Sequence, residues 1–286
     1  MSCYICGCKS YHKRDGKVRD DNSINILECD DCGLVFLDNF KEMDYEGSKM
    51  HEQARVYELT ERRDLIKDQY LFNKSRLDFC LNFMIGKDVL DFGSGYGGFA
   101  ILAKEFANSI SAVELESAVE PIYQKEGIPL FKNLVELENK KFDLITAFHV
   151  IEHLSEPANM LKSLAKLLKK GGRLIVEVPN ANDALLSIYE NRAFMEFTYW
   201  SAHFYLFNTH TLRKLGQKAG LKVDFIKPIQ RYPLSNTLYW LSRGLPAGQK
   251  KWGNFIDSTS LCEAYGATLA SLGATDTLIA SFSVES

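Results

Sequence analysis

The pattern of hydrophobic and polar positions separates an irregular N-terminal stretch from a helical stretch and from a longer region of alternating strands and helices. Residues 51–85 contain no Gly or Pro, and their apolar side chains recur at the three- and four-residue spacing of an amphipathic helix. These apolar positions are Val56, Leu59, Ile66, Tyr70, Leu77, Leu81 and Met84. We therefore expect one long helix or two consecutive helices, which pack on the region that follows or also close over a cofactor pocket.

Beyond residue 86, short apolar runs alternate with helical stretches, which is typical of an α/β sheet. The runs DVLDF, SISAV, KFDLITAF and RLIVEVPN are expected to form buried strands, with a helix in SEPANMLKSLAKLLKKGG. Ser155 is expected to cap that helix, with Pro157 in its first turn. Further helices are expected at residues 209–219 and 258–272, and further strands in LKVDFIKPI and TDTLIASFSVE.

The composition is that of a globular protein and changes this picture little. Hydrophobic residues make up 46% of the 286 residues and charged residues 25%, which indicates neither disorder nor a fibrous repeat. The sequence has no apolar run of about 18 residues, and the N-terminus MSCYICGCKS lacks the pattern of a signal peptide. We expect a soluble, cytoplasmic protein. The net charge of −3 gives no overall attraction to nucleic acid or to a membrane surface.

Two cysteine pairs near the N-terminus have the spacing of zinc ligands. The pairs are Cys3-x2-Cys6 and Cys29-x2-Cys32, and a glycine follows each. Two thiolates from one tight turn span an edge of a tetrahedron, and a second pair completes it. We predict a structural zinc at these four residues in preference to unpaired thiols. Two neighbouring side chains could replace a ligand: Cys8 and His12.

The charge of residues 1–46 bears on the role of this zinc ribbon. The segment holds six Lys or Arg and ten Asp or Glu, a net charge of −4 before any thiolate is counted. This is the wrong sign for binding nucleic-acid phosphates. We therefore expect the ribbon to pack on its neighbour or to help cover a small-molecule site.

A glycine-rich turn follows the first strand of the α/β region, in the sequence DVLDFGSGYGGFAILA. The glycines at positions 93, 95 and 97 allow a tight turn and a close approach of the backbone to a ligand. The helix that follows begins with free N–H groups. Taken alone, this turn is ambiguous, because Gly93, Gly95 and Gly98 also fit the dinucleotide fingerprint G-x-G-x-x-G.

Two acidic residues beside this turn help to distinguish the cofactors. Glu114 ends the second strand, and its carboxylate could accept hydrogen bonds from both ribose hydroxyls of either cofactor. Asp91 lies two residues before the first glycine. Its carboxylate can bind an ammonium group, which S-adenosylmethionine has and a dinucleotide lacks. Asp91 therefore favours S-adenosylmethionine.

The order of four sequence segments resembles the class I S-adenosylmethionine-dependent methyltransferases. VLDFGSGYGGF, VELE, FDLITAFHVIEHL and LLKKGGRLIVEVPN are similar to the successive signature segments of that family, and the resemblance covers about residues 70–286. With the cysteine pairs in front, the whole chain is similar to bacterial methyltransferases that carry an N-terminal zinc ribbon, several of which modify sugars. The resemblance implies an α/β fold with a Rossmann-like, seven-stranded sheet and an antiparallel C-terminal hairpin.

The resemblance also implies a division of the chain into three parts. These are a zinc ribbon at residues 1–46, linker or cap helices at 47–85 and a methyltransferase domain at 86–286. Within the last part we expect an aromatic lid at 181–207 and an insertion at 232–256 that forms a partner surface or part of the substrate rim.

The same resemblance implies which residues hold the cofactor. They are Asp91, Gly93, Ser94, Gly95 and Gly97 for the methionine part, Glu114 for the ribose, Leu115 for the adenine face, and Asn133 and Leu134 for the adenine edge.

The segment FHVIEHLSEP follows the fourth strand and carries His149, Glu152 and His153. Ligands of an open α/β sheet lie beyond the carboxyl ends of its strands, so these side chains are expected beside the methyl donor. Three roles are open for them. A histidine, His149 rather than His153, could be a general base that removes a proton from the acceptor. Glu152 and His153 could instead hydrogen-bond the backbone at the helix start, or all three could bind a divalent metal.

The metal role depends on spacing and on a second resemblance. His149 and His153 are four residues apart, and Glu152 lies three residues after His149, so one helical face would carry them. The segment resembles the E-x-x-E-H segment of the ubiquinone-pathway O-methyltransferases and the small-RNA 2′-O-methyltransferases, in which a downstream histidine completes a metal site. Here His203 or His210 could be that histidine. Because His149 replaces the first Glu, imidazole-binding metals such as zinc, iron or nickel are favoured over magnesium.

Residues 189–207 contain eight aromatic side chains. They predict a lid packed on the core, a pocket wall against a sugar or base ring, or both. The candidate substrate residues in this stretch are Arg192, Tyr199, Trp200, His203 and Tyr205.

The sequence thus predicts a zinc-ribbon methyltransferase that moves the methyl group of S-adenosylmethionine to a small polar acceptor. The family resemblance alone favours a saccharide, a hydroxyl of a sugar or nucleotide-sugar in surface-glycan or secondary-metabolite biosynthesis. Nucleic acid and membrane are not expected as partners. An RNA methyltransferase that docks through the ribbon, a dinucleotide-dependent oxidoreductase and a non-catalytic scaffold are the alternatives.

Overall fold

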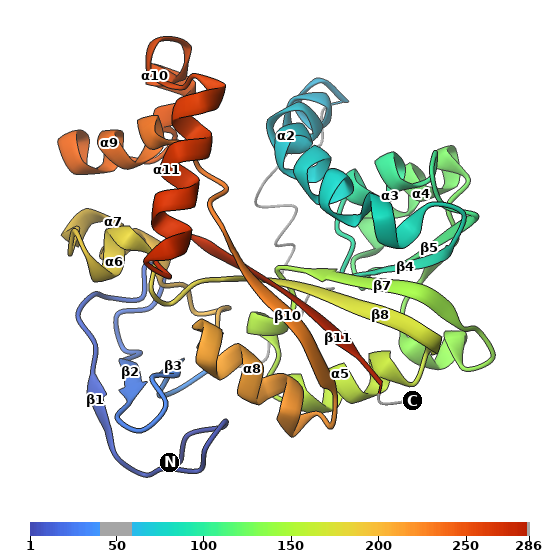
Figure 1. Cartoon of the computed structure of the whole chain (residues 1–286), viewed down its shortest axis with the longest axis horizontal. Helices are drawn as coiled ribbons and strands as arrows, with labels where there is room; N and C mark the ends of the chain where they lie inside the picture. The colour runs from blue at the N-terminus through green and yellow to red at the C-terminus, as the bar shows by residue number, and fades with distance from the viewer. Residues whose placement is uncertain (41–58, 285–286) are drawn as a thin grey trace.

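A seven-stranded sheet forms the centre of the computed structural model, which describes residues 1–40 and 59–284, with side chains for 1–40 and 69–284 (Figure 1). The strands lie in the order β10-β11-β8-β7-β4-β5-β6. Their bounds are β4 (Asp88–Phe92), β5 (Ser109–Val113), β6 (Leu130–Phe131), β7 (Phe142–Phe148), β8 (Leu168–Pro179), β10 (Lys222–Ile229) and β11 (Thr277–Ser283). Strands β4 to β8 pair in parallel, whereas β11 runs antiparallel to both β8 and β10. The predicted sheet with its antiparallel C-terminal hairpin is confirmed.

Helices cover both faces of this sheet (Figure 1). One face carries α2 (Leu59–Met84), α3 (Gly98–Ala103) and α4 (Glu120–Glu126), and the other carries α5 (Pro157–Ala165) and α8 (Thr209–Lys218). Because side chains alternate along a strand, Val89 packs in the core under α2, and its neighbour Leu90 packs in the core under α5 and α8. The predicted helix at residues 51–85 is confirmed for α2; residues 47–58 of the predicted linker lie outside the described residues.

A smaller sheet joins the N-terminal ribbon to the α/β region. Its order is β1 (Tyr11–Lys13), β2 (Ile26–Cys29), β3 (Val35–Leu37) and β9 (Tyr205–Leu206). Leu34 and Phe36 of the ribbon share one buried cluster with Phe204 and with Leu212 of α8. The acidic ribbon therefore packs on its neighbour, as its charge led us to expect. Residues 41–46, the predicted end of the ribbon, lie outside the described part of the chain.

The start of α5 corrects one local prediction. Pro157 is the first residue of the helix, as expected, but the N-cap is Glu156, which makes no side-chain cap hydrogen bond. Ser155 is therefore not the cap. The Ala158 N–H instead donates to Tyr4 Oη at 3.1 Å. A side chain of the ribbon thus takes the place of a local cap, which the spacing of nearby residues could not reveal.

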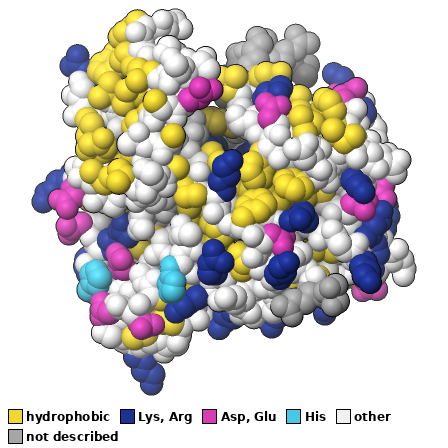
Figure 2. Space-filling model, viewed as in Figure 1, with side chains coloured by type: hydrophobic (Ala, Val, Ile, Leu, Met, Phe, Trp, Pro, Cys, Tyr) yellow, Lys and Arg dark blue, Asp and Glu magenta, His cyan; other side chains and the backbone are white. Residues whose placement is uncertain are grey.

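The predicted insertion is largely helical, and the predicted lid contains two short helices and β9. The remaining helices are α6 (Ala184–Ser187), α7 (Arg192–Thr198), α9 (Leu234–Arg243), α10 (Gly248–Ile256) and α11 (Thr259–Ser271), and the short 3-10 helices are η1 (Ser117–Val119), η2 (Leu134–Leu137) and η3 (Ile151–His153). Hydrophobic side chains gather over α9 to α11 at the upper left of Figure 2, with Leu241, Leu245 and Phe255 exposed. None of the described helices is long and apolar enough to cross a membrane.

The packing of α8 on the C-terminal hairpin gives a stability prediction. A Cβ added at Gly216 of α8 would lie 2.3 Å from Cε1 of the buried Phe282 ring. We expect Gly216→Ala to lower the free energy of unfolding by about 1–3 kcal/mol, because overpacking outweighs the better helix propensity of Ala. Gly266→Ala in α11 is the matched control: its nearest neighbour would be Gln230 Cβ at 3.4 Å, so we expect a gain of about 0.5–1 kcal/mol. Urea unfolding measures both, and equal effects would contradict this account.

Candidate active site and metal centre

The predicted cofactor and acceptor residues meet at one edge of the large sheet. The glycine turn follows β4, Glu114 follows β5 and His149 follows β7. These three strands are adjacent and parallel, so their carboxyl ends lie at the same edge, where ligands bind in open α/β folds. The topology therefore brings together the segments that the sequence separates.

The backbone of the glycine turn is held from both sides. Gly93 has a φ of 67°, and a Cβ there would lie 2.4 Å from Val150 Cγ2, so glycine is required at this position. Tyr123 Oη lies 2.6 Å from Ser94 Oγ and 3.0 Å from the Gly95 carbonyl oxygen. At Gly95, a Cβ would meet no atom within 4 Å. The turn is thus packed on its protein side and open beside Gly95. Gly97, with a φ of 76°, is the N-cap of α3.

Glu114 stabilises the same turn. Its carboxylate accepts hydrogen bonds from the Gly95 N–H at 2.8 Å and the Glu116 N–H at 3.1 Å. A carboxylate has about four acceptor positions, so Glu114 retains capacity for ribose hydroxyls. The neighbouring Leu115 side chain is 46% exposed, so its apolar surface is accessible for the predicted contact with adenine.

Asn133 has a local structural role. Its side-chain oxygen accepts from the Val135 and Glu136 N–H groups and caps η2, where Glu136 completes a capping box. Leu134 is partly buried against the core. Contacts of Asn133 and Leu134 with adenine remain predictions.

Asp91 lies fully buried below the glycine turn and accepts a hydrogen bond from Thr146 Oγ1 at 2.8 Å. Burial raises the pKa of its carboxyl group to about 7, although Thr146 and Arg76 act in the opposite direction. Removal from water disfavours the negative charge of a carboxylate, and the partners of Asp91 stabilise this charge only in part. An ammonium group at the turn would supply the missing charge.

On the acceptor side, His149 lies between two carboxylates. His149 Nδ1 is 3.1 Å from Glu152 Oε1, and His149 Nε2 is 2.8 Å from Glu177 Oε1. The backbone of His149 has a φ of 56°, and its N–H donates to the Glu177 carbonyl at 2.8 Å. A left-handed conformation is uncommon for residues other than glycine, so the surrounding contacts fix this ring with some backbone strain.

Glu177 is the centre of a buried charge network that the sequence analysis missed. Arg76 of α2 makes a bidentate contact with it, with Nη2 2.6 Å from Oε1 and Nε 3.0 Å from Oε2. Arg231 Nη1 lies 3.5 Å from the same carboxylate and contacts His149 Nε2. Burial alone would raise the pKa of Glu177, but the charges of Arg76 and Arg231 hold it well below its usual range. The sequence offered one indication of this network, which is the acidic residue inside the apolar run RLIVEVPN. Nothing in the sequence around Arg76 or Arg231 indicated that they take part.

Glu152, His153 and His203 form a compact group of potential metal ligands. One ligand atom of each lies within 4.8 Å of the others. Glu152 Oε2 and His153 Nδ1 are buried and have no hydrogen-bond partner among the described residues. Burial lowers the pKa values of His153 and His203, the latter to about 3. Neutral imidazoles and an ionised carboxylate are the forms that bind a metal, so this donor set fits a divalent ion. His210, the alternative in the sequence, is not in the group.

The predicted substrate residues fall into two sets. Trp200 and His203 pack edge-on against the His153 ring, with centroid distances of 5.8 Å and 4.7 Å. Tyr199 and Tyr205 are 1% and 5% exposed and pack in the core, which favours the lid interpretation for these two side chains. Arg192 is exposed at the start of α7. A substrate role for these residues remains a prediction.

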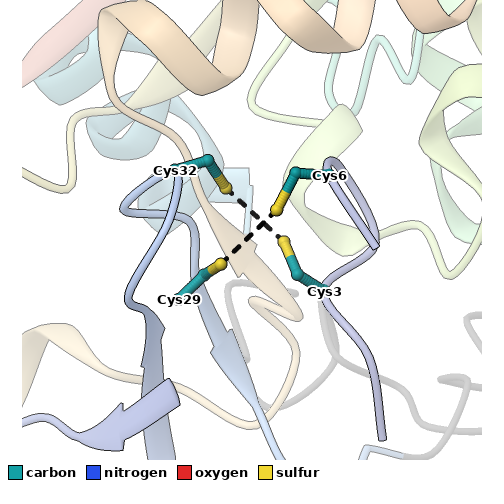
Figure 3. A group of neighbouring side chains, drawn as sticks. All are labelled: Cys3, Cys6, Cys29 and Cys32. Carbon is teal, nitrogen blue, oxygen red and sulfur yellow. Dashed lines mark hydrogen bonds between the residues drawn. The ribbon is translucent and has the colours of Figure 1, made fainter. Parts of the chain in front are cut away.

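The four cysteines converge as the spacing predicts (Figure 3). Their sulfur atoms lie within 4.8 Å of one another, with Cys3 Sγ 3.5 Å from Cys32 Sγ and Cys6 Sγ 3.5 Å from Cys29 Sγ. Four thiolates at Zn–S bonds of about 2.3 Å require sulfur separations of about 3.8 Å, so the group fits a tetrahedral zinc. The spare candidates lie elsewhere: Cys8 contacts Ser10, and His12 contacts Asp30.

The sheet order and the glycine turn define the class as a class I S-adenosylmethionine-dependent methyltransferase. The chain belongs to this group: a family model described as a methyltransferase domain matches residues 63–224, more than half of the sequence. The chain is therefore an S-adenosylmethionine-dependent methyltransferase, and the oxidoreductase and scaffold alternatives are set aside.

Relatives in sequence agree with this assignment. The ubiquinone biosynthesis O-methyltransferase of Aeromonas salmonicida is 26% identical over 190 residues, which is 59% of this chain and 79% of that protein. The enzyme of the same name from Coxiella burnetii is 25% identical over 186 residues, 60% of this chain and 80% of that protein. Neither name refers to a sugar.

Two crystal structures share the fold. An S-adenosylmethionine-dependent methyltransferase from Thermotoga maritima has a TM-score of 0.53 at 22% identity and covers 82% of this chain and 99% of its own. The 1,6-didemethyltoxoflavin-N1-methyltransferase of Burkholderia thailandensis, with bound S-adenosylhomocysteine, has a TM-score of 0.53 at 14% identity and covers 95% and 100%.

The raised pKa of Asp91 predicts a pH-dependent cofactor affinity. At pH 6 the carboxyl group is mostly protonated and neutral, so it attracts an ammonium group weakly. At pH 7 about half of the carboxyl groups are charged. We expect the dissociation constant of S-adenosylmethionine to fall roughly fivefold from pH 6 to pH 7, a range in which the ligand's amino group stays protonated. Calorimetry measures this. Asp91→Asn should bind weakly and without this slope, whereas Asp88→Asn on the same strand should keep it. An unchanged slope in Asp91→Asn would contradict the assignment.

Proposed function

We propose that this methyltransferase transfers the methyl group to an oxygen of a small polar acceptor, with a sugar or nucleotide-sugar hydroxyl as the first choice. The observation that carries the proposal is the group Glu152, His153 and His203 at the carboxyl end of β7, beside the glycine turn. Its unpaired buried atoms are suited to activating an acceptor hydroxyl. The curated relatives reported above are named O-methyltransferases, which supports an oxygen acceptor.

In this proposal the glycine turn holds the donor. Asp91 binds the ammonium group, the backbone at Gly95 admits the methionine part, and Glu114 binds the ribose hydroxyls while it fixes the turn through the Gly95 N–H. Leu115 covers the adenine. Because Asp91 lies on β4 and Glu114 directly follows the adjacent strand β5, they bind both ends of the donor, and the methyl group is directed at the acceptor side. Such positioning can account for several kcal/mol of the barrier.

We infer that a divalent metal, in addition to the zinc of the cysteines, binds Glu152, His153 and His203. Two imidazoles and one carboxylate with open positions suit iron, zinc or a similar ion, which would lower the pKa of a bound hydroxyl. In this scheme His149 is a positioning residue, because its Nδ1 contacts Glu152 Oε1 and its Nε2 contacts Glu177. The base role that the sequence favoured for His149 receives no support from these contacts, since both ring nitrogens already have carboxylate partners.

The sugar component of the proposal has less support than the oxygen component. Trp200, whose ring adjoins His153 and His203, offers the kind of aromatic surface against which sugars and bases bind. The positive charges of Arg76 and Arg231 more than balance the negative charge of Glu177. A divalent ion at Glu152 would therefore give the acceptor side a net positive charge, which suits an acceptor that carries a phosphate. An RNA acceptor has the same chemistry, but the ribbon that would dock it carries a net charge of −4.

Methyl transfer from labelled S-adenosylmethionine tests the function directly. Purified protein is incubated with separate small-molecule and RNA fractions of a cell extract, and labelled products are analysed by mass spectrometry. We expect label in the small-molecule fraction, on an oxygen, and its loss in Asp91→Ala. Label in RNA would support the alternative. Protein that binds the cofactor yet labels no fraction would contradict a catalytic role.

Metal analysis separates the two predicted metal sites. We expect about two ions per chain after loading with zinc or iron and removal of free metal. Cys3→Ser should lose one ion, because it breaks the tetrahedral set, and His203→Ala should lose the other. His210→Ala is the matched control and should retain both. A wild-type protein that holds one ion, lost only in Cys3→Ser, would refute the second site.

A further inference from the structure

The segment that carries His203 is bound to the ribbon at both ends. In this segment, residues 199–206, which we call the strap, β9 pairs with β3, and the Leu37 N–H donates to the Phe204 carbonyl at 3.1 Å. At the other end, the Arg19 N–H donates to the Tyr199 carbonyl at 2.9 Å. Backbone hydrogen bonds from two separate parts of the ribbon therefore hold the strap.

Side chains of the ribbon hold the loop between these two ends. Asp20 accepts hydrogen bonds from Ser201 N–H at 3.0 Å and from Ser201 Oγ at 2.6 Å. The guanidinium of Arg19 lies over the Trp200 ring, 4.8 Å from its centroid. Asp20 and Arg19 of the ribbon thus hold Ser201 and Trp200 on the side of the strap that faces the ribbon.

The inner side of the strap faces the acceptor site. The Phe204 N–H donates to the Glu152 carbonyl at 2.9 Å, and the His203 N–H donates to the Trp200 carbonyl at 2.9 Å. The His203 ring packs edge-on against His153 at 4.7 Å. The position of His203 relative to Glu152 and His153 therefore depends on a segment whose other side is held by the ribbon.

The cysteine cluster connects to the strap through two strands. Cys29 is the last residue of β2, and its N–H donates to the Leu34 carbonyl at 2.9 Å, directly before β3. Strand β2 pairs with β3, and β3 pairs with β9. Gly33, which follows the second cysteine pair, also accepts from Asn208 Nδ2 at 3.1 Å. An ion that fixes the cysteines fixes the strand to which the strap is paired.

We propose that the zinc ribbon is a positioning element of the acceptor site: it holds the strap so that His203 lies against Glu152 and His153. Asp20 is a positioning residue in this arrangement. The donor side has no direct contact with the ribbon among those described above, because the contacts of the glycine turn come from β5, α4 and Val150. The assignment of this site to the acceptor rests on the proposed function. The position of the strap can be measured without any acceptor.

Hydrogen exchange in the full-length protein tests the role of Asp20. We expect Asp20→Ala to speed exchange of the strap amides, including His203 and Phe204, about fivefold or more, since each lost hydrogen bond of about 1 kcal/mol is worth about a factor of five. Asp20→Asn retains an acceptor oxygen and should restore most of the protection. The matched control is Asp21→Ala, because Asp21 accepts from Ser23 N–H and Oγ in the same way within the ribbon; it should leave the strap unchanged.

Removal of zinc tests the link to the cysteines. Cys3→Ser should speed exchange in the strap more than Asp20→Ala does. The amides of β4 and β7 and the dissociation constant of S-adenosylmethionine should stay within about twofold of wild type, because the hydrogen bonds of these strands are made within the large sheet. If an acceptor has been identified, both variants should raise its KM or lower kcat without changing the KM of the cofactor.

Two outcomes would overturn the proposal. Unchanged exchange of the strap in both Asp20→Ala and Cys3→Ser would show that the ribbon does not position it. Equally faster exchange in β4 and β7, with weaker cofactor binding, would make the ribbon a general stabilising element. Absence of methyl transfer to every acceptor would contradict the proposed function but not this result, because exchange and cofactor affinity are measured without an acceptor.

Discussion

Burial of several carboxylates at one edge of the sheet is the constraint on which the site depends. Asp91, Glu114, Glu152 and Glu177 are each at most 9% exposed, and an ionised carboxylate away from water is costly unless it is paired or hydrogen-bonded. The protein meets this cost in different ways. Glu114 accepts from backbone N–H groups, and Glu177 is paired with two arginines. The requirement for these partners sets the positions of α2, the glycine turn and the loop after β10.

The degree of compensation separates residues that support the site from residues that are suited to bind. Glu177 has several cationic partners, and its pKa is held well below the usual range. Asp91 has one neutral donor, Thr146, and burial raises its pKa to about 7. Glu152 has an imidazole on one oxygen and no partner on the other among the described residues. Asp91 therefore lacks a cationic partner, whereas, against the effect of burial, the imidazoles beside Glu152 lower the pKa of its carboxyl group to about 2 and leave one oxygen without a partner among the described residues.

The sequence predicted most of the fold because its signals are local. Apolar runs, the glycine turn and the cysteine pairs each specify structure within a few residues, and the predicted strands of the large sheet are present. Strand β8 begins earlier than expected, at Leu168, inside the stretch that was predicted to be helical. The site was predicted only in part. Its network joins Arg76, Glu177 and Arg231, which come from α2, β8 and the loop beyond β10, and no spacing connects such distant positions. The prediction of the cap of α5 was wrong for the same reason, because Tyr4, which is distant in the sequence, binds the first turn of this helix.

The choice between His203 and His210 shows what tertiary structure adds to a spacing argument. Both histidines follow FHVIEHLSEP at distances compatible with a fourth ligand, so the sequence could not rank them. His210 lies in the first turn of α8, after the chain has left β9, whereas His203 precedes β9 and packs against His153. The pairing of β9 with β3 decides between them, because it holds the chain before β9 next to η3, and the chain after β9 enters α8. A strand from the ribbon thus determines which histidine reaches the acceptor site.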